Sequence, residues 1–385
     1  MEMKAYVASV GLEKVGDRWS ESLLDLAVSA SLKALDARKV APQQVIVGNM
    51  FSSAGARQEH LGALLASSLG LKGTPAYKVE SACASGSTAF DVAYTMVKSG
   101  AIDSALVVGV EKMRDVEPEE VSLALAMAES VEYTQFVGAS FAALNGLLAR
   151  HYMERENVSR DELSALPVLS HANAVTAEHA QFRKAITPEV VARSAMVADP
   201  LRLFDCAPVG DGAAAALVVN ENTIGRAKSG LVEILGGAIA TTEFSVYERK
   251  DMLRFEATET AFKRALGQAG LPESKVGLIE THDAFSVVAA LSLEAMGVSK
   301  RGKAGSDAKE GRFNLDGDMP INTFGGLKAR GHPVGATGVY QIAEAYLQLT
   351  DAAGKNQVKD LEYAVTQNVG GVDTSAVVHV FGRAQ

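Results

Sequence analysis

The stretch YKVESACASG, residues 77–86, decides the fold of this chain. A short strand, Tyr77–Glu80, passes at once into small residues, and a helix follows from about Gly86 to Ser99. A sharp strand-to-helix turn exposes its central side chain, here Cys83, at the carboxyl edge of a sheet. The free N–H groups and the positive dipole end of the helix favour a thiolate there. The stretch predicts a nucleophilic cysteine in an α/β fold; the alternative is a buried structural cysteine.

Strand-like and helix-like segments alternate on both sides of this turn. We expect strands at Met3–Val10, Val45–Val47 and Ala105–Val110. We expect helices at Ser20–Leu35, where apolar residues recur at helical spacing, and at His60–Leu69. Alternation of this kind predicts parallel βαβ units.

The alternation stops between about residues 113 and 203. This part holds few strand-like runs, an acidic patch at residues 115–120 and helical segments such as Ser140–Tyr152. The strand pattern resumes at Ala213–Val219. We therefore expect an inserted, mainly helical loop domain, and insertions of this size usually cover a site.

The second half of the chain repeats the order of elements in the first. A helix end, a proline turn and a short strand occur at residues 34–47 and again at residues 265–279. A helix opens at Gly335–Gly338, matching the one after Cys83, and strands near residues 363–367 and 374–381 close the half. The match predicts an internal duplication, with halves at residues 1–222 and 223–385. The alternative is a coincidence of common βα patterns.

Composition excludes several classes of protein. Of 385 residues 48% are hydrophobic, which is enough for a large core, and the net charge is -9 with a pI of about 5.4. A nucleic-acid-binding protein normally has a basic face, so no nucleic-acid partner is expected. Two cysteines cannot form a disulfide framework, and no apolar run reaches membrane-spanning length. The N-terminus carries no apolar signal region, so we expect a cytoplasmic protein without a membrane partner.

Two of the seven histidines lie in an unusual context. His282 follows an apolar strand in THDAF, and His332 lies in GGLKARGHPVGATG, where five glycines fall within fourteen residues. Junctions between strands and helices face the ligand crevice of open α/β sheets, and histidine suits proton transfer near neutral pH. A lone histidine is more often structural, but two such junctions and a matching cysteine favour a site. The other histidines lack this context: His60, His151, His171, His179 and His379.

Other chemistries have no support in the sequence. There is no HExxH motif, no thiol or acidic cluster with ligand spacing and no phosphate-binding loop, so we expect neither a metal nor a nucleotide cofactor. Cys206 precedes an apolar strand without a helix start behind it, and we expect it to be a packed cysteine.

Taken together, these segments resemble the thiolase superfamily. The stretch VESACASG, residues 79–86, is similar to its nucleophile segment, and GHPVGATG, residues 331–338, is similar to its G-H-P-x-G-x-[ST]-G signature. The resemblance implies the thiolase fold, with two similar βαβαβαββ halves in a layered α-β-α-β-α core and a loop domain inserted in the first half. His282-Asp283-Ala284-Phe285 is similar to the archaeal and sterol-carrier-protein branch. Archaeal members of that branch are acetoacetyl-CoA thiolases that feed 3-hydroxy-3-methylglutaryl-CoA synthesis.

The chain departs from the family pattern at the second catalytic cysteine. Ordinary thiolases carry it in a late C-x-G motif, where this chain has Asn368. Sterol-carrier-type thiolases carry it in H-D-C-F, where this chain has Ala284. The departure leaves open which residue acts as the base in the second reaction step.

The resemblance implies an acyl-CoA C-acyltransferase, of the acetyl-CoA C-acetyltransferase type, that needs coenzyme A thioesters but no cofactor. Cys83 would form the acyl-enzyme, and His332 would activate it. The backbone of Gly370 would contribute to the oxyanion hole, His282 would be the remaining base, and Asn368 would orient a water or the thioester oxygen. The alternatives are a condensing synthase with a different acyl donor and a non-catalytic acyl-CoA-binding subunit.

The same resemblance implies partners. It implies a homodimer or homotetramer, and an assembly with 3-hydroxy-3-methylglutaryl-CoA synthase and a small OB-fold CoA-binding protein. A free-standing homo-oligomer is the alternative.

Overall fold

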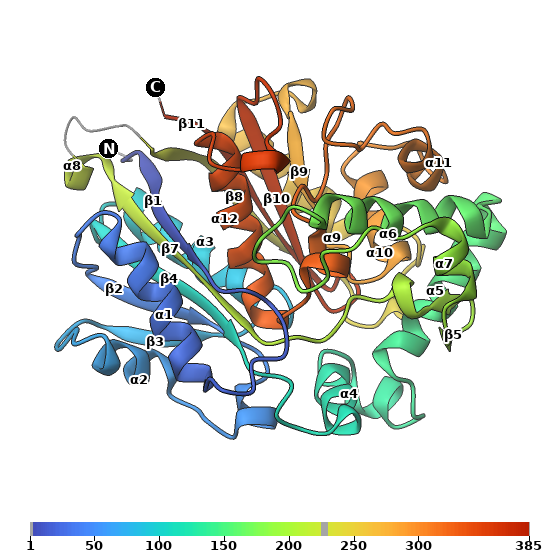
Figure 1. The fold of residues 1–385 in the computed structure, drawn as a ribbon, viewed down its shortest axis with the longest axis horizontal. Helices are drawn as coiled ribbons and strands as arrows, with labels where there is room; N and C mark the ends of the chain where they lie inside the picture. The colour runs from blue at the N-terminus through green and yellow to red at the C-terminus, as the bar shows by residue number, and fades with distance from the viewer. Residues whose placement is uncertain (1–2, 225–229, 385) are drawn as a thin grey trace.

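A computed structural model describes residues 3–224 and 230–384, and its main feature is one mixed sheet of nine strands (Figure 1). Their order across the sheet is β3-β2-β4-β7-β1-β8-β11-β10-β9. The strands of the N-terminal part are β1 (Ala5–Leu12), β2 (Gln44–Gly48), β3 (Ala76–Val79), β4 (Ser104–Glu111) and β7 (Gly212–Asn220). Those of the C-terminal part are β8 (Val232–Thr241), β9 (Leu278–Glu280), β10 (Tyr363–Gly370) and β11 (Ser375–Arg383). The two parts meet where β1 pairs with β8, at Tyr6 with Glu233 and Val7 with Val232.

We call the strands of the N-terminal part and those of the C-terminal part the two half-sheets. Helices cover both faces of each half-sheet, and two helices lie between the half-sheets. The helices are α1 (Leu23–Asp36), α2 (Leu61–Ser68), α3 (Ser85–Lys98), α8 (Glu221–Ile224), α9 (Glu256–Ala269), α10 (Ser286–Ala295), α11 (Ala304–Lys309) and α12 (Thr337–Leu349), together with those of the insertion below. In the centre, α3 and α12 pack on each other and on strands of both half-sheets, whereas α1 packs on β7 and β1 and α9 packs on β8 and β11 from outside. This arrangement is the layered α-β-α-β-α core that the resemblance implies.

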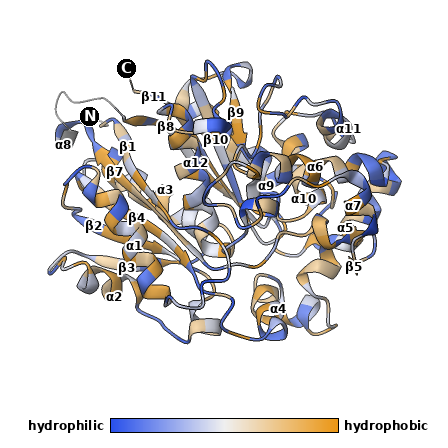
Figure 2. Ribbon diagram, viewed as in Figure 1, coloured by the Kyte–Doolittle hydropathy of each residue, from blue (hydrophilic) through white to orange (hydrophobic). Residues whose placement is uncertain are grey.

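The strand residues alternate between these layers, because successive side chains of a strand point to opposite faces. On β4, Val107 packs into the central cluster with α3 and α12, and Val108 packs into the outer cluster with α1 and α2. Ala364 and Val365 of β10 divide in the same way between the central cluster and the cluster of α9 and α10. Figure 2 shows the apolar colour along β4 and β7, as expected for strands covered on both faces.

The prediction of parallel βαβ units is correct for only part of the sheet. The pairs β2–β3, β2–β4 and β9–β10 are parallel, but β4–β7, β1–β7, β8–β11 and β10–β11 are antiparallel. A parallel pair needs a crossover, usually one helix. The chain instead enters β7 after the long insertion, and only residues 371–374 join β10 to β11.

The ends of the predicted helices shift where a side chain caps the backbone. The helix expected from Ser20 begins at Leu23, because Ser22 and Asp25 form a reciprocal capping box. The helix expected at Ser140–Tyr152 begins after the cap Ser140 and continues to Glu156.

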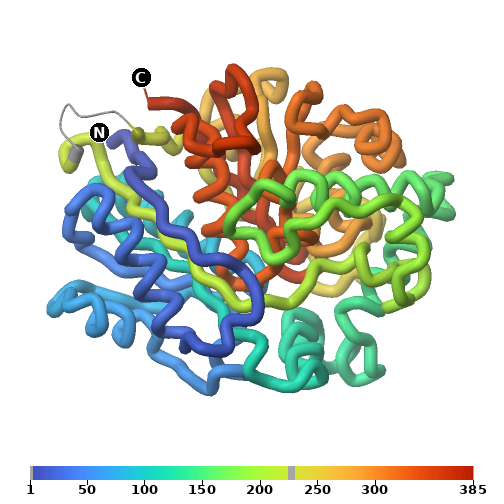
Figure 3. The backbone as a smooth tube through the Cα atoms, viewed as in Figure 1, coloured from blue at the N-terminus to red at the C-terminus, as the bar shows by residue number. Residues whose placement is uncertain are grey.

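The insertion between β4 and β7 is mainly helical (Figure 3). It contains α4 (Pro118–Ala126), α5 (Phe141–Glu156), α6 (Arg160–Ala174), α7 (Pro188–Arg193) and a small hairpin of β5 (Met196–Ala198) and β6 (Leu201–Arg202). Although it leaves from the first half of the chain, its helix α6 packs on α10 and α11 of the second half. The division at residues 222 and 223 stays a prediction.

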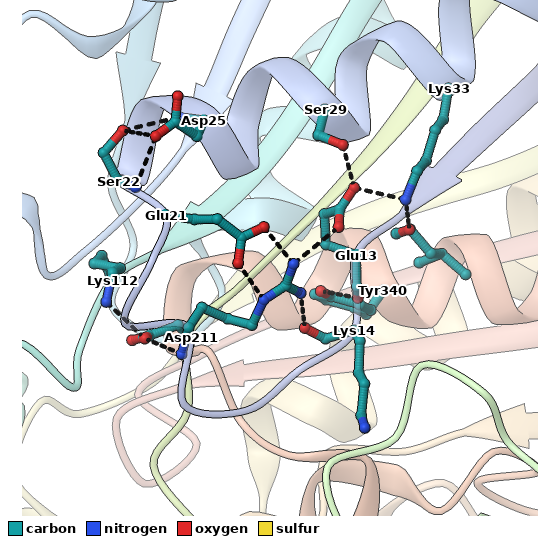
Figure 4. A network of polar contacts seen from close by, with 12 residues as sticks. Glu13, Lys14, Glu21, Ser22, Asp25, Ser29, Lys33, Lys112, Asp211 and Tyr340 are labelled. Atoms are coloured by element: carbon teal, nitrogen blue, oxygen red, sulfur yellow. Dashed lines mark hydrogen bonds and ion pairs between the residues drawn. The ribbon is translucent and has the colours of Figure 1, made fainter.

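Asp211 joins the two ends of the insertion (Figure 4). Its carboxylate accepts hydrogen bonds from the backbone N–H of Met113 at 2.6 Å and from Lys112 Nζ at 2.8 Å. These residues follow β4, and Asp211 directly precedes β7. The insertion therefore starts and ends at one buried charge pair, between the end of β4 and the start of β7.

Candidate active site

Cys83 lies in a strained turn between β3 and α3. Ala82, just before it, has a φ of +49°, the left-handed region that residues with a Cβ rarely adopt. Ser85 Oγ holds the turn by accepting from the backbone N–H of Ser81 and donating to the carbonyl of Ala82. A Cβ on Gly86 would lie 2.6 Å from the Gly335 carbonyl oxygen, so only glycine allows the start of α3 to approach the glycine-rich loop of the second half. The predicted nucleophile turn is present in the structure.

His332 has a fixed ring orientation in that glycine-rich loop. Its Nδ1 lies 2.7 Å from Thr337 Oγ1, and the Thr337 hydroxyl donates its own hydrogen to the Pro333 carbonyl at 3.2 Å. Thr337 therefore accepts from His332 Nδ1–H, which leaves the lone pair on Nε2. A neutral imidazole with a free Nε2 can take a proton from a neighbouring thiol.

His282 follows β9, where it is fixed by residues of the neighbouring strand β10. The backbone N–H of His282 donates to Gln367 Oε1 at 2.8 Å, and its Nδ1 lies 2.9 Å from Asn368 Nδ2. Asn368 was expected to orient a water or the thioester oxygen; in the structure its amide contacts the histidine ring. An amide nitrogen only donates, so this orientation places the His282 proton on Nε2.

The two histidines and the cysteine meet at one point. One ligand atom of each of Cys83, His282 and His332 lies within 4.8 Å of those of the other two. The two imidazole rings are 5.2 Å apart and nearly perpendicular, at 84°. The sequence prediction named these three residues from three distant segments, and the fold brings them together. Their individual roles, and the expectation of no resident metal, stay predictions.

Burial keeps this cluster uncharged in the resting protein. Burial and the carboxylate of Glu111 raise the pKa of the Cys83 thiol to about 12, so burial outweighs the helix start and the expectation of a thiolate is wrong for the resting site. Burial, together with Arg330 and Lys328, lowers the pKa of His282 to about 3. Burial also lowers the pKa of His332 well below its usual value, and His282 and Arg330 add to this. The site therefore holds a thiol and two neutral imidazoles at neutral pH, so the nucleophile has to be deprotonated as it attacks.

Glu111, at the end of β4, was missed in the sequence. Its buried carboxylate accepts from the backbone N–H of Met50 at 2.6 Å and of Gly335 at 3.0 Å, and from Asn49 Nδ2 at 2.9 Å. Burial raises the pKa of Glu111 to about 7, although the backbone hydrogen bonds to its carboxylate act to lower it. Glu111 thus ties the loop after β2 to the loop that carries His332.

Gly370 lies at the end of β10, against the turn of Cys83. A Cβ added to it would be 2.6 Å from the Ser81 carbonyl oxygen and 3.5 Å from the Cβ of Ala84. Only glycine fits this close approach, which places the backbone of Gly370 beside the nucleophile turn. The position is compatible with the predicted oxyanion role, which stays a prediction.

An apolar pocket of about 240 Å³ opens beside the cluster. Its wall includes Cys83 and His332, Leu125 and Phe141 of the insertion, and Cys206. Cys206 was expected to be a packed cysteine, and it does pack against the core as a partly buried residue, but it also lines the same pocket as Cys83. Burial raises the pKa of its thiol to about 11, and its Sγ donates to the Arg202 carbonyl at 3.6 Å. The insertion therefore covers the site, as its length predicted.

Two family profiles cover almost all of the chain. Residues 4–222 match "Thiolase, N-terminal domain", and residues 237–383 match "Thiolase C-terminal domain-like". The chain belongs to the thiolase family. This thiolase is 38% identical to the acetyl-CoA acetyltransferase of Methanothermobacter thermautotrophicus, over 98% of this chain and 99% of that protein. It is 31% identical to rat sterol carrier protein 2, over 98% of this chain and 72% of that protein. The predicted archaeal and sterol-carrier-protein branch is confirmed.

Solved structures agree with the fold. The thiolase superposes on the Ltp2-ChsH2(DUF35) aldolase with a TM-score of 0.86 at 21% identity, covering 99% of this chain and 98% of that one. It superposes on human mitochondrial 3-ketoacyl-CoA thiolase in complex with CoA with a TM-score of 0.77 at 18% identity, covering 100% of this chain and 98% of that one. In the described ranges, 3–224 and 230–384, no helix is both long and apolar enough to cross a membrane.

Proposed function

We propose that this thiolase is an acetyl-CoA C-acetyltransferase, which interconverts two acetyl-CoA molecules with acetoacetyl-CoA and CoA through an acyl-enzyme on Cys83. The observation that carries the proposal is the convergence of Cys83, His282 and His332 within 4.8 Å beside an apolar pocket. The names of the archaeal relatives, at 38% and 35% identity over nearly the full chain, support the same activity.

The first half-reaction acylates Cys83. His332 takes the thiol proton through Nε2 as the sulfur attacks the thioester carbonyl, and the proton then passes to the departing CoA sulfur. The backbone N–H groups of Cys83 and Gly370 hold the oxyanion. The elevated pKa of the thiol fits concerted removal of its proton, since a free thiolate is scarce in the resting site.

The second half-reaction forms the carbon–carbon bond. A second acetyl-CoA loses an α-proton to the base, and its carbanion attacks the acyl group and breaks the acyl–sulfur bond. The base then returns the proton to the released Cys83 thiolate, which restores the thiol. His282 is the base in this proposal. This role requires the Asn368 amide to turn so that its oxygen accepts Nδ1–H, which frees the Nε2 lone pair. As the amide is placed, Nε2–H would instead donate to the thioester oxygen.

One observation favours a second candidate, a condensing synthase with a different acyl donor. Neither family position for the second cysteine carries one here, because Ala284 and Asn368 occupy them. The resulting cysteine and two histidines resemble the set of ketosynthases. A non-catalytic acyl-CoA-binding subunit has less support, because both histidines keep orienting partners.

A thiolysis assay separates these candidates. Purified protein is given acetoacetyl-CoA with CoA, and acetyl-CoA formation is followed together with loss of the free thiol. An acetyltransferase consumes one CoA and forms two acetyl-CoA per turnover. Acylation of Cys83 without thiolysis would favour the synthase, and no acylation at all would leave only the binding subunit.

We also propose that this thiolase is cytoplasmic and works as a homo-oligomer in an assembly with 3-hydroxy-3-methylglutaryl-CoA synthase and a small OB-fold CoA-binding protein. One structural neighbour, the Ltp2-ChsH2(DUF35) aldolase, has a DUF35 component in its name, which is compatible with a small partner. A second support is the surface of the insertion at residues 123–137. Phe136 is 86% exposed, and other large apolar side chains near it are also exposed: Leu123, Met127, Val131, Tyr133 and Val137. Apolar patches of this kind mark interaction sites.

Native mass spectrometry of the complex from its host tests the assembly. Phe136→Asp should release the partners, whereas Trp19→Asp, an exposed aromatic outside the insertion, should not. A pure homo-oligomer whose thiolysis activity is unchanged by adding the candidate partners would contradict the assembly but leave the acetyltransferase proposal intact.

A further inference from the structure

The Cys83–His282–His332 cluster has the composition of a metal site as well as that of a catalytic triad. One sulfur and two imidazole nitrogens are donors of the kind that bind zinc, whereas magnesium and calcium take oxygen donors. Tetrahedral zinc, with bonds of about 2.3 Å to sulfur and about 2.1 Å to nitrogen, holds its donors roughly 3.3–3.6 Å apart. The three donor atoms here lie within 4.8 Å of one another, so small side-chain shifts would bring them into place.

The residues around the two rings strengthen this interpretation. Histidine ligands of metals usually donate their other ring N–H to a fixed acceptor, which orients the coordinating nitrogen. Thr337 Oγ1 is such an acceptor for Nδ1 of His332, at 2.7 Å. Asn368 stands 2.9 Å from Nδ1 of His282, and its oxygen can accept Nδ1–H once the amide turns. Both Nε2 atoms are then free to coordinate.

Three protein donors leave one position of a tetrahedral ion open. Cys83 and His332 line the pocket of about 240 Å³, which gives an ion both an entry path and room for a fourth ligand such as water. Zinc sites with three protein ligands and one open position bind small ligands reversibly, unlike closed structural sites.

We propose that Cys83, His282 and His332 reversibly bind a thiophilic divalent cation of the zinc class, which competes with acylation of Cys83. Binding replaces the Cys83 S–H bond by a sulfur–metal bond and releases one proton to solvent. No oxidation or reduction takes place. The metal is an inhibitor in this proposal, because it occupies the sulfur that must attack the thioester. The proposal concerns the free site and stands whichever acyl donor the enzyme uses.

Cobalt(II) provides a direct readout, since a Co²⁺–thiolate bond gives a charge-transfer absorption that can be titrated without substrate. Chelator-treated full-length protein should take up Co²⁺ with this band, and Zn²⁺ should displace it. The band should be lost in Cys83→Ala and in wild-type protein alkylated at Cys83, which covers the case that the alanine variant folds poorly. Cys206→Ala, which removes the other thiol of the pocket, should keep it.

Two further arms test the orienting contacts and the competition. Thr337→Val keeps the side-chain shape but removes the acceptor of His332, and it should weaken Co²⁺ binding on the order of 10–100-fold. Prior incubation with acetyl-CoA should block Co²⁺ uptake, and a chelator should reverse inhibition by buffered Zn²⁺. A band that survives in Cys83→Ala, or no band in the wild type, would overturn the proposal. A normal band in a protein without thiolysis activity would instead contradict the proposed acetyltransferase.

Discussion

Asn368 Nδ2 lies 2.9 Å from Nδ1 of His282, although the two residues are 86 positions apart in the chain. The amide therefore selects which nitrogen of His282 carries the proton. With its nitrogen on Nδ1, His282 donates through Nε2–H; with its oxygen there, His282 has a basic Nε2. A residue that cannot accept a proton itself can thus decide whether its neighbour acts as an acid or as a base.

Replacing Asn368 tests this selection. A carboxylate can only accept, so Asn368→Asp fixes the proton on Nδ1 and should preserve α-proton exchange of bound acetyl-CoA, with its acidic limb moved to higher pH because the new charge raises the pKa of His282. Asn368→Leu removes the partner and should slow exchange on the order of 10²-fold. Deuterium uptake at the acetyl methyl group measures both. Loss of exchange in the aspartate variant alone would mean that His282 acts as a donor.

The two histidines should have separable effects. His332→Ala should slow acylation of Cys83, on the order of 10²–10⁴-fold, because it removes the imidazole whose Nε2 is kept free by the Thr337 contact at Nδ1. His282→Ala should leave acylation largely intact and block α-proton exchange. Rapid-quench mass measurement of the acyl-enzyme reads the first step, and deuterium uptake reads the second. Exchange at the wild-type rate in His282→Ala would exclude His282 as the base and make Cys206 the next residue to test.

Cys83 should be the thiol whose modification abolishes activity, although both cysteines line the pocket. Its pKa of about 12 predicts that alkylation by iodoacetamide accelerates about tenfold per pH unit across the neutral range. Glu111→Gln removes a nearby negative charge and should therefore speed alkylation at a given pH. Peptide mapping with and without acetyl-CoA identifies the protected cysteine, and Cys206→Ala is the matched control. Protection confined to Cys206 would refute the proposed nucleophile.

The sequence predicted those parts of the site that depend on local chain geometry. A strand followed at once by small residues and a helix places Cys83, and the glycine-rich loop places His332, without knowledge of distant contacts. Glu111 could not be found in this way. Its importance comes from Met50 and Gly335, which lie 61 and 224 positions away, and its own neighbours form an ordinary buried strand.

The pairing of the strands was predictable only where one helix joins two strands. One α-helix joins β2 to β3 and one α-helix joins β3 to β4, a connection that predicts parallel strands. In the structure, β3 and β4 each pair with β2 in parallel. The direction of β7 depends on where the insertion returns, and the Asp211 contacts to Lys112 and Met113 fix that point. Such contacts between distant segments have no periodic signature in the sequence.

Glu129, in the insertion, should make the stability of the protein depend on pH. It is 3% exposed, and burial raises its pKa from 4.5 to about 7 despite the attraction of Arg249. The pKa of Glu129 is higher in the folded state than in the unfolded state. The stability that its protonated carboxyl contributes is therefore fully present below the unfolded-state pKa, and it is lost as the pH rises through about 7. Glu129→Gln cannot ionise, so its free energy of unfolding should gain about 1–3 kcal/mol relative to wild type between pH 5 and pH 8. Urea unfolding at the two pH values measures this gain.

Glu111 and Asp373, whose pKa values burial also raises to about 7, are present in both proteins and cancel from the difference between wild type and Glu129→Gln. The exposed Glu120→Gln on α4 is the control, and an equal gain there would show that the effect does not come from the buried carboxyl.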